Sequence, residues 1–201
     1  MLDELGVDAF TIRELSRRAD VAQRTLYNVF GSKEDIIASA IELHFNSLIE
    51  ATPPDVSEGG VDTLFHRTNQ TVDVIIRLRR YAAAMVGVFF APGADPKIHN
   101  SLVRIWRIGA ANWMDQPAAK SLLVKMPRAQ IDVLAALLLN AAYANIGDWV
   151  SGRVSEAEFR RRYTVNSLMI ARSYLKPRVR AEADEIIATA FAGGSDDPAS
   201  R

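Results

Sequence analysis

One stretch of the chain, Thr11–Ile41, constrains the fold more than any other, because it carries two short helical patterns joined by a tight turn. The first pattern predicts a helix over Ile12–Ala19, whose apolar positions recur at helical spacing. Thr11 lies at the N-cap, and Glu14 three residues later completes a capping box. Phe10 precedes the cap, at the position of a hydrophobic staple. The cap, the box and the staple together define where this helix begins.

The second pattern predicts a helix over Ala22–Phe30 with two chemically different faces. Its apolar residues fall at helical spacing and are expected to be buried; they are Ala22, Leu26, Val29 and Phe30. The opposite face is polar and consists of Gln23, Arg24, Tyr27 and Asn28, with Thr25 at its edge. A helix this short is unstable alone, so its apolar face must dock on neighbouring elements. Arginine forks onto guanine, amides pair with adenine, and tyrosine and threonine hold phosphates, so the polar face suits a DNA groove.

A third helix is predicted to begin after Gly31 and to run to about Glu50. Ser32 is its N-cap, and Asp35 occupies the N3 position of a capping box. Lys33 lies in the first turn, where it adds a phosphate contact because helix N-termini bind anions. Residues 1–50 are therefore expected to form a DNA-binding domain, called the head below.

This stretch resembles the helix-turn-helix of the TetR family of bacterial repressors. The family pattern is a threonine cap followed by I-x-x-x-A-G-V-S-x-x-T-L-Y-x-x-F-x-S-K-E-x-L. It appears here as Thr11, Ile12, Leu15, Ala19, Val21, Thr25, Leu26, Tyr27, Phe30, Ser32, Lys33, Glu34 and Ile36. The string T-L-Y-x-x-F-x-S-K-E is specific to the family, although the resemblance covers only about the first fifth of the chain. It implies a homodimer that inserts the helix Ala22–Phe30 into the major groove of a palindromic operator.

Three positions depart from the family pattern. Asp20 stands where glycine is usual between the two helices, and aspartate tolerates the left-handed conformation better than most residues. Ala22 replaces the serine that normally caps the recognition helix, which costs about 1 kcal/mol. Met1–Leu5 is expected to supply only the last turn of the family's first helix, which packs on the other two.

Charge and composition limit the classes of function. The chain has 24 basic and 24 acidic side chains, so no global positive field indicates nucleic acid. Residues 1–50 carry five basic and nine acidic side chains, which counts against strong non-specific DNA binding. The lack of cysteine excludes disulfides and thiolate metal sites. No secretory signal is recognisable, and the longest apolar run, 81–92, is too short to cross a bilayer. We expect a cytoplasmic protein that does not contact a membrane.

The rest of the chain is predicted to be helical as well, so the fold class is all-α. A linker at 51–60 is followed by a helical period that continues through Arg77, Arg79 and Arg80 to Phe90. Asp95 caps the next helix, with Pro96 at its first position. Further helical segments are expected near 122–125, from about 127 to 152, from 155 to 175 and from Pro177 onward. Residues 193–201 read as a disordered tail.

The family resemblance implies that residues 51–192 form a ligand-binding and dimerisation domain. In such proteins the last two long helices, here about 127–152 and 155–175, form a four-helix bundle with a second subunit. A small-molecule effector is expected among aromatic and polar residues on inward faces. The candidates are His66, Asn69, Met85, Phe89, Trp106, Trp113, Asn140 and Tyr143. The sequence does not identify the effector.

No catalytic, cofactor or metal site is indicated. The sequence lacks the G-x-S-x-G, G-x-G-x-x-G and Walker patterns, and its three histidines are scattered without an H-E-x-x-H motif. We therefore expect a ligand-responsive transcriptional repressor, in which the effector shifts the population toward a spacing of the two heads that no longer fits the operator. The alternative is a dimeric small-molecule-binding helical protein with weakened or lost DNA binding. The acidic head, Asp20, Ala22 and the short first helix favour that alternative.

Overall fold

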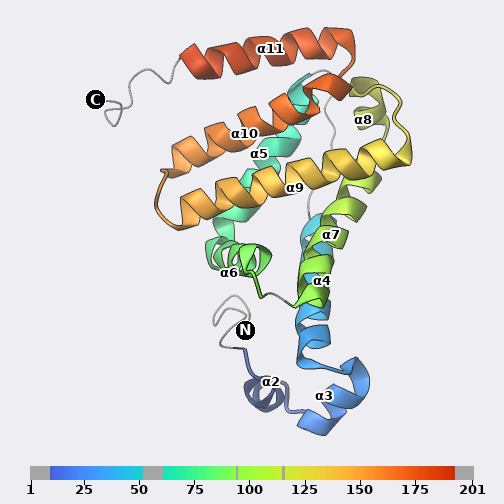
Figure 1. Ribbon diagram of the computed structural model, residues 1–201, viewed down its shortest axis with the longest axis vertical. Coiled ribbons are helices and arrows are strands. Elements are labelled where there is room, and N and C mark those ends of the chain that lie inside the picture. The colour runs from blue at the N-terminus through green and yellow to red at the C-terminus, as the bar shows by residue number, and fades with distance from the viewer. Residues whose placement is uncertain (1–9, 52–60, 94, 115, 193–201) are drawn as a thin grey trace. The chain divides into compact units, whose positions relative to one another are not determined.

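The structure is a computed structural model that describes residues 10–51, 61–93, 95–114 and 116–192 (Figure 1). All regular structure in these ranges is helical, apart from one isolated β-bridge between Leu123 and Leu175, which confirms the all-α prediction. The chain divides into two compact units, one formed by residues 1–53 with 74–109 and the other by residues 54–73 with 110–201. The helices Lys33–Ala51 and Arg79–Phe90, and most of the helix Pro96–Met114, therefore belong to the same unit as the two short helices between residues 12 and 30.

The first unit contains α2, α3 and α4, all of α6 and most of α7. Their bounds are Ile12–Ala19, Gln23–Phe30, Lys33–Ala51, Arg79–Phe90 and Pro96–Met114. The predicted starts of α2, α4 and α7 are confirmed, since Asp95 Oδ1 accepts a hydrogen bond from the Lys97 amide at 2.8 Å in the same way that Thr11 and Ser32 cap the earlier helices. The interior of this unit includes fully buried aliphatic side chains, among them Ile41 and Leu102, together with the buried Tyr81 and Met85.

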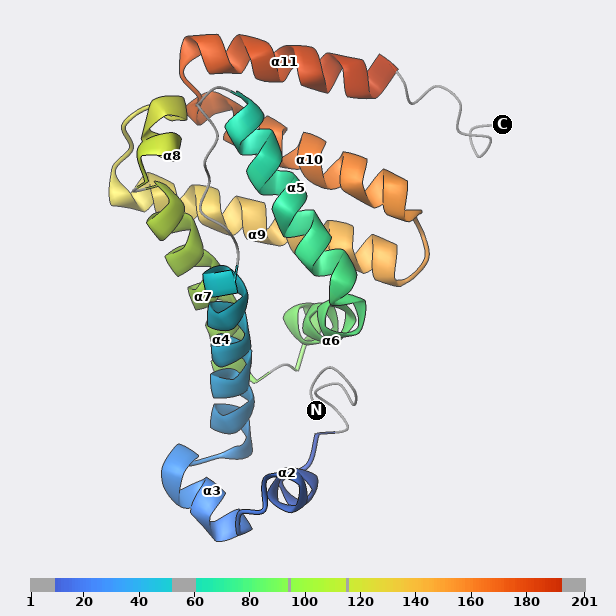
Figure 2. The same cartoon turned by 180° about the vertical axis from the view of Figure 1, so that it is seen from behind.

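The second unit contains most of α5, together with α8 to α11. Their bounds are Val61–Arg77, Pro117–Leu122, Arg128–Val150, Glu156–Ala171 and Pro177–Ala192, with a 3₁₀ turn at Arg172–Tyr174. Figures 1 and 2 show α9 and α10 as an antiparallel hairpin, and α11 packs on α10. Ser155 begins α10 as predicted, because its hydroxyl accepts the Glu158 amide at 3.2 Å.

A leucine-rich core holds the second unit together. Leu122, Leu168 and Leu175 are almost completely shielded from solvent and belong to one cluster. Two backbone hydrogen bonds fix the segment after α8 beside the segment before α11: the Val124 amide donates to the Tyr174 carbonyl, and the Lys176 amide to the Leu122 carbonyl, both at 2.8 Å. Burial of several such leucines contributes roughly 2 kcal/mol each, so this cluster is a main source of the unit's stability.

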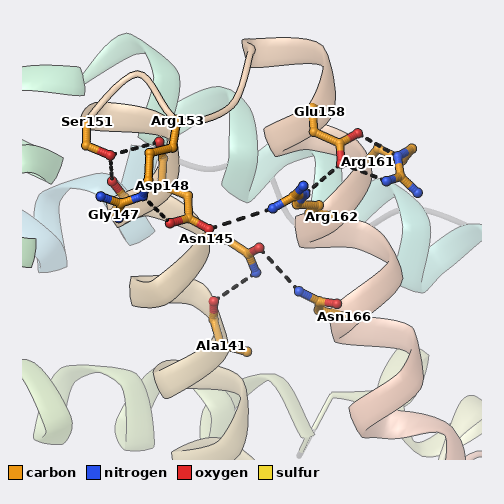
Figure 3. A network of polar contacts seen from close by, with 10 residues as sticks. All are labelled: Ala141, Asn145, Gly147, Asp148, Ser151, Arg153, Glu158, Arg161, Arg162 and Asn166. Carbon is orange, nitrogen blue, oxygen red and sulfur yellow. Dashed lines mark hydrogen bonds and ion pairs between the residues drawn. The ribbon is translucent and has the colours of Figure 1, made fainter. Parts of the chain in front are cut away.

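Polar side chains also join α9 to α10 (Figure 3). The buried Asn145 amide donates to the Ala141 carbonyl at 2.8 Å, and its oxygen accepts from the Asn166 amide at 3.2 Å. Nearer the turn, the carboxylate of Glu158 accepts hydrogen bonds from two arginines, and the pKa of Glu158 falls to about 2 because Arg161 and then Arg162 stabilise its charged form.

The second of these arginines extends the network across the hairpin. Arg162 lies 3.7 Å from Asp148, which also pairs with Arg153 at 2.8 Å (Figure 3). The turn between α9 and α10 is thus fixed by charge as well as by its left-handed Gly152, which has a φ of 77°.

Two helix predictions are wrong in detail. The pattern over 61–90 is broken at Leu78, where φ is −105° and ψ is 35°, so α5 and α6 are separate helices. Arg77 and Arg80 are three residues apart, a like-charge spacing that weakens a continuous helix. The helix expected near 122–125 lies earlier, in α8, because Leu123 is extended, with φ of −96° and ψ of 148°, and the Val124 amide donates to Tyr174 instead of continuing the helix.

Some predicted features lie outside the described residues. These are the helical turn at Met1–Leu5, most of the linker at 51–60 and the tail at 193–201. The functional boundary predicted at residue 50 stays a prediction, since the two compact units follow spatial contact rather than function.

Tyr81 on α6 gives a test of the first unit's core. Its side chain is 6% exposed, its ring centroid lies 4.6 Å from that of His44, and its hydroxyl has no hydrogen-bond partner among the described residues. Burial raises the pKa of Tyr81 above its ordinary value, since the interior disfavours the phenolate.

We predict that Tyr81→Phe stabilises the protein by about 1 kcal/mol, because the substitution removes a buried hydroxyl that lost its water without gaining a partner. Urea unfolding followed by circular dichroism measures the change. Tyr27→Phe, which removes an exposed hydroxyl, is the matched control and should be close to neutral. A clear loss of stability in Tyr81→Phe would mean that the hydroxyl is hydrogen-bonded after all.

Candidate nucleic-acid interface

Helix α2 is stabilised at its start and along its exposed side. The Thr11 hydroxyl accepts the Glu14 amide at 3.3 Å, as the capping box predicts. The Glu14 carboxylate also accepts hydrogen bonds from Arg17 at 2.7 and 3.0 Å and from Arg18 at 2.7 Å, and these bonds lower the pKa of Glu14 to about 2. Two of the head's five positive charges are thereby paired, which leaves less free charge for phosphates.

The turn between α2 and α3 depends on Asp20 and Ser16. Asp20 adopts the left-handed conformation expected of the position, with φ of 53° and ψ of 43°. The Ser16 carbonyl accepts the Val21 amide at 3.1 Å, and the Ser16 hydroxyl donates to the Val21 carbonyl at 2.6 Å. Ser16 therefore closes the turn. The sequence does not predict this role, because a serine inside a helical pattern gives no local signal for a contact five residues away.

Helix α3 presents its predicted polar face to solvent. Gln23, Arg24, Thr25 and Asn28 are exposed, and Tyr27 is 44% exposed. Leu26 on the opposite side is 8% exposed, so the helix docks through this residue. Lys33 in the first turn of α4 is half-buried. The predicted side chains thus lie on one helix and at the beginning of the next, within the same unit.

The predicted apolar face of α3 is only partly buried. Ala22 is exposed, Val29 is 69% exposed and Phe30 is 39% exposed. Among the described elements, α3 contacts α2 and α4, and these cover the side that carries Leu26. Val29 and Phe30 lie at the last turn, beyond the residues that these two helices shield. The expectation that all four apolar residues are buried is therefore wrong.

The junction between α3 and α4 is a compact set of hydrogen bonds. The Ser32 hydroxyl accepts the Asp35 amide at 3.1 Å and donates to Asp35 Oδ2 at 2.5 Å. Lys97 on α7 donates to the same carboxylate oxygen at 2.8 Å. Lys97, followed by Ser32, holds the pKa of Asp35 below its ordinary value. Gly31 has a φ of 94°, and a Cβ there would lie 3.3 Å from Asp35 Oδ2, so only glycine suits the position.

The eight effector candidates are divided between the two units. Met85, Phe89 and Trp106 belong to the first, whereas His66, Asn69, Trp113, Asn140 and Tyr143 belong to the second. Met85 and Tyr143 are buried, but His66 and Asn140 are exposed and so do not lie on inward faces of the chain. Their side chains make contacts one turn away, His66 with Gln70 at 2.9 Å and Asn140 with the Ala136 carbonyl at 2.9 Å.

The comparisons with known proteins match this architecture. Residues 1–40 match the family described as bacterial regulatory proteins, tetR family, a range that includes α2, α3 and the first turns of α4. The fold is similar to the crystal structure of a TetR transcriptional regulator from Rhodococcus sp. RHA1, with 22% sequence identity and a TM-score of 0.56 over 82% of this chain and 87% of that chain. A search of curated proteins found no match.

The uncapped start of α3 offers a test of how the reading helix is held. Ala22 has the extended backbone of an N-cap, with φ of −60° and ψ of 140°, but makes no side-chain capping bond. We predict that Ala22→Ser stabilises the protein by about 0.5 kcal/mol, because the hydroxyl would offer a second acceptor to the Thr25 amide, which already donates to the Ala22 carbonyl at 2.9 Å. Thermal unfolding measures the gain, and Ala22→Val, which adds bulk without an acceptor, is the control. A serine variant no more stable than the valine variant contradicts the assignment of the cap.

Proposed function

We propose that this chain is a transcriptional regulator of the tetR family of bacterial regulatory proteins, that it binds a palindromic operator as a homodimer, and that it releases the operator when a small-molecule effector binds. Each subunit inserts α3 into a major groove, and the two-fold axis of the dimer requires a two-fold related pair of half-sites. The protein acts as a cytoplasmic repressor and carries out no catalysis of its own.

One observation carries this proposal: α3 buries Leu26 and exposes a face of side chains that can form hydrogen bonds with bases and phosphates in a DNA groove. Arg24 supplies the guanidinium that pairs with guanine, and Asn28 and Gln23 supply amides that pair with adenine. Tyr27 and Thr25 add hydroxyls for the phosphates that flank the bases. Lys33 lies at the N-terminus of α4, where the helix dipole and the ammonium both attract a phosphate.

The charge of the head indicates how the protein would find its site. Residues 1–50 carry more acidic than basic side chains, and Glu14 neutralises part of the basic charge on α2. Non-specific binding should therefore be weak, since it depends on neutralising phosphates. Specific contacts from α3 would supply most of the affinity, with a modest dependence on salt.

The exposed apolar side chains of α9 and α10 support a dimer through these helices. Val133 and Leu137 on α9 are 55% and 49% exposed, and Met169 on α10 is 51% exposed. Helix α9 is apolar enough to cross a membrane by length and composition, yet only half of its apolar window is buried within the chain. A second copy of the same hairpin would cover the remainder by a two-fold contact.

The effector is proposed to bind within one of the two units, either beside the buried Met85 and the half-buried Phe89 and Trp106 of the first, or beside the buried Tyr143 and the half-buried Asn69 and Trp113 of the second. The exposed His66 and Asn140 are not retained as candidates. Its binding would favour a conformation in which the two heads no longer match adjacent grooves. Such a shift requires that the effector bind one conformation more tightly than the other.

The reading residues can be tested on an operator selected from a random double-stranded DNA pool with the purified protein. We predict that Arg24→Ala or Tyr27→Ala weakens binding by about 1–3 kcal/mol, because each removes a base or phosphate contact. Fluorescence anisotropy at fixed salt measures the affinity. Arg178→Ala is the control, since this arginine on α11 is 92% exposed and carries the same charge. Unchanged affinity after both α3 substitutions would refute the docking of this helix.

The rival function is a dimeric helical ligand binder without DNA activity. The acidic head and the missing serine cap at Ala22 favour it. The same selection separates the two, because a protein that enriches no sequence from the pool while remaining a folded dimer supports the rival.

The dimer surface makes a separate prediction. Leu137→Arg should convert the dimer to a monomer, because it places a charge in the centre of the proposed contact and costs several kcal/mol if buried unpaired. Multi-angle light scattering after size exclusion measures the mass. Phe191→Arg on α11, where the side chain is 59% exposed, is the matched control and should leave the mass unchanged. A dimeric Leu137→Arg would exclude α9 from the interface.

A further inference from the structure

Two ion pairs connect α4 to α7. Lys97 donates to Asp35 Oδ2 at 2.8 Å, and Arg104 pairs with Glu42 two turns further along both helices. In each pair the partners are 62 positions apart in the sequence, so the helices run in the same direction with one register. All four residues belong to the first compact unit.

The shared register makes the two pairs act together. Sliding α4 along α7 by one turn, about 5.4 Å, would separate Asp35 from Lys97 and Glu42 from Arg104 at the same time. The helix positions between the pairs carry buried aliphatic side chains, including Ile37, Ile41 and Leu102. Aliphatic packing resists a slide of a full turn, but it is non-directional and distinguishes small tilts and rotations less sharply, so the ion pairs add a preference among those smaller changes.

The first pair meets α4 where the reading head joins it. Asp35 is hydrogen-bonded to Ser32, which caps α4 and follows α3 after the single residue Gly31. Lys97 is itself fixed at the start of α7, where its amide donates to Asp95. This series of contacts runs from Asp95 through Lys97 and Asp35 to Ser32, which only Gly31 separates from the end of α3.

Exposure decides what the pairs can do. The side chains of Lys97 and Arg104 are 56% and 59% exposed, and those of Asp35 and Glu42 are 33% and 28% exposed. Ion pairs this accessible contribute little to overall stability. Their expected effect is to favour one of several closely similar arrangements of α4 on α7 by a small free energy.

We infer that Lys97 and Arg104 are positioning residues: through Asp35 and Glu42 they fix the angle at which the helix-turn-helix leaves α7, and so set the half-site spacing that the dimer accepts. This inference rests on the proposed operator binding. It adds a cause for spacing specificity that lies outside α3 and outside the dimer surface.

The experiment uses the full-length protein and its selected operator, together with versions that carry one base pair more or one fewer between the half-sites. The variants are Lys97→Gln with Arg104→Gln, and the charge-reversed pair Glu42→Arg with Arg104→Glu. Arg178→Gln on α11 is the control, because it breaks an exposed ion pair within one helix in the second unit. Affinity for each DNA is measured at fixed salt, and each variant's urea unfolding is compared with that of the unaltered protein.

We expect the unaltered protein and Arg178→Gln to discriminate strongly against altered spacing. For each altered DNA we take the ratio of its dissociation constant to that of the selected operator. In the Lys97→Gln, Arg104→Gln double variant this ratio should fall by about three- to tenfold, since each exposed pair couples its partners by about two- to fivefold. The charge-reversed variant, in which the Lys97–Asp35 pair is intact and the Glu42–Arg104 pair is rebuilt with opposite charges, should keep most of the discrimination. An unchanged ratio, or an equal loss of affinity on every DNA, overturns the inference, because the first means the pairs are merely solvated and the second means a general structural role.

A second readout separates this inference from the proposed function. Hydrogen exchange at the Asp35 and Ile36 amides, which bond to the Ser32 hydroxyl and carbonyl at 3.1 and 3.2 Å, reports the hold on the start of α4 without DNA. These amides should exchange several-fold faster in the double variant. If no operator can be selected but exchange is faster, the proposed function fails while the positioning contact stands. Unchanged exchange overturns the contact itself.

Discussion

An eight-residue helix cannot stand by itself in water, and the head of this protein is arranged around that constraint. Helix α3 buries one large side chain, Leu26, and leaves both its polar face and part of its apolar face in solvent. What keeps it in place lies at its ends, where Asp20 and Ser16 close the turn before it and Gly31 and Ser32 close the turn after it. A reading helix held at both ends can expose nearly all of its middle to a ligand.

Electrostatics in the head favour order over net attraction to DNA. Glu14 binds two arginines of α2, and Asp35 binds a lysine from α7, so these basic charges are neutralised within the protein. Such pairs add little stability when exposed, but they reduce the number of conformations that the long side chains and their helices adopt. The consequence is a head whose recognition depends on shape and hydrogen bonding at α3 rather than on a basic field.

The local signals in the sequence predicted much of this structure, and the long-range contacts lay beyond them. Thr11, Ser32 and Ser155 each began a helix as expected, because capping depends on residues within one turn. The break at Leu78 and the end of α8 at Leu122 escaped prediction, since the first lies within an unbroken helical period and the second depends on the hydrogen bond from Val124 to Tyr174, fifty residues away. For the site, helical spacing predicted which residues of α3 face outward, but burial of Val29 and Phe30 depends on how far neighbouring helices reach. Nothing in the sequence pointed to Ser16 or Lys97, whose partners are five and 62 residues distant.

The amide pair between Asn145 and Asn166 has a consequence for assembly. It lies between α9 and α10, on the same seam as the Arg162–Asp148 contact, and a slip of either helix would separate the buried Asn145 from the half-buried Asn166 and leave their polar groups without each other. Leucine and alanine contacts alone would permit several nearly equivalent alignments of the hairpin. Because the amides disfavour every alignment of the two helices but one, Val133, Leu137 and Met169 keep fixed relative positions on the surface of the hairpin. Any molecule that binds these side chains therefore meets a single arrangement of them.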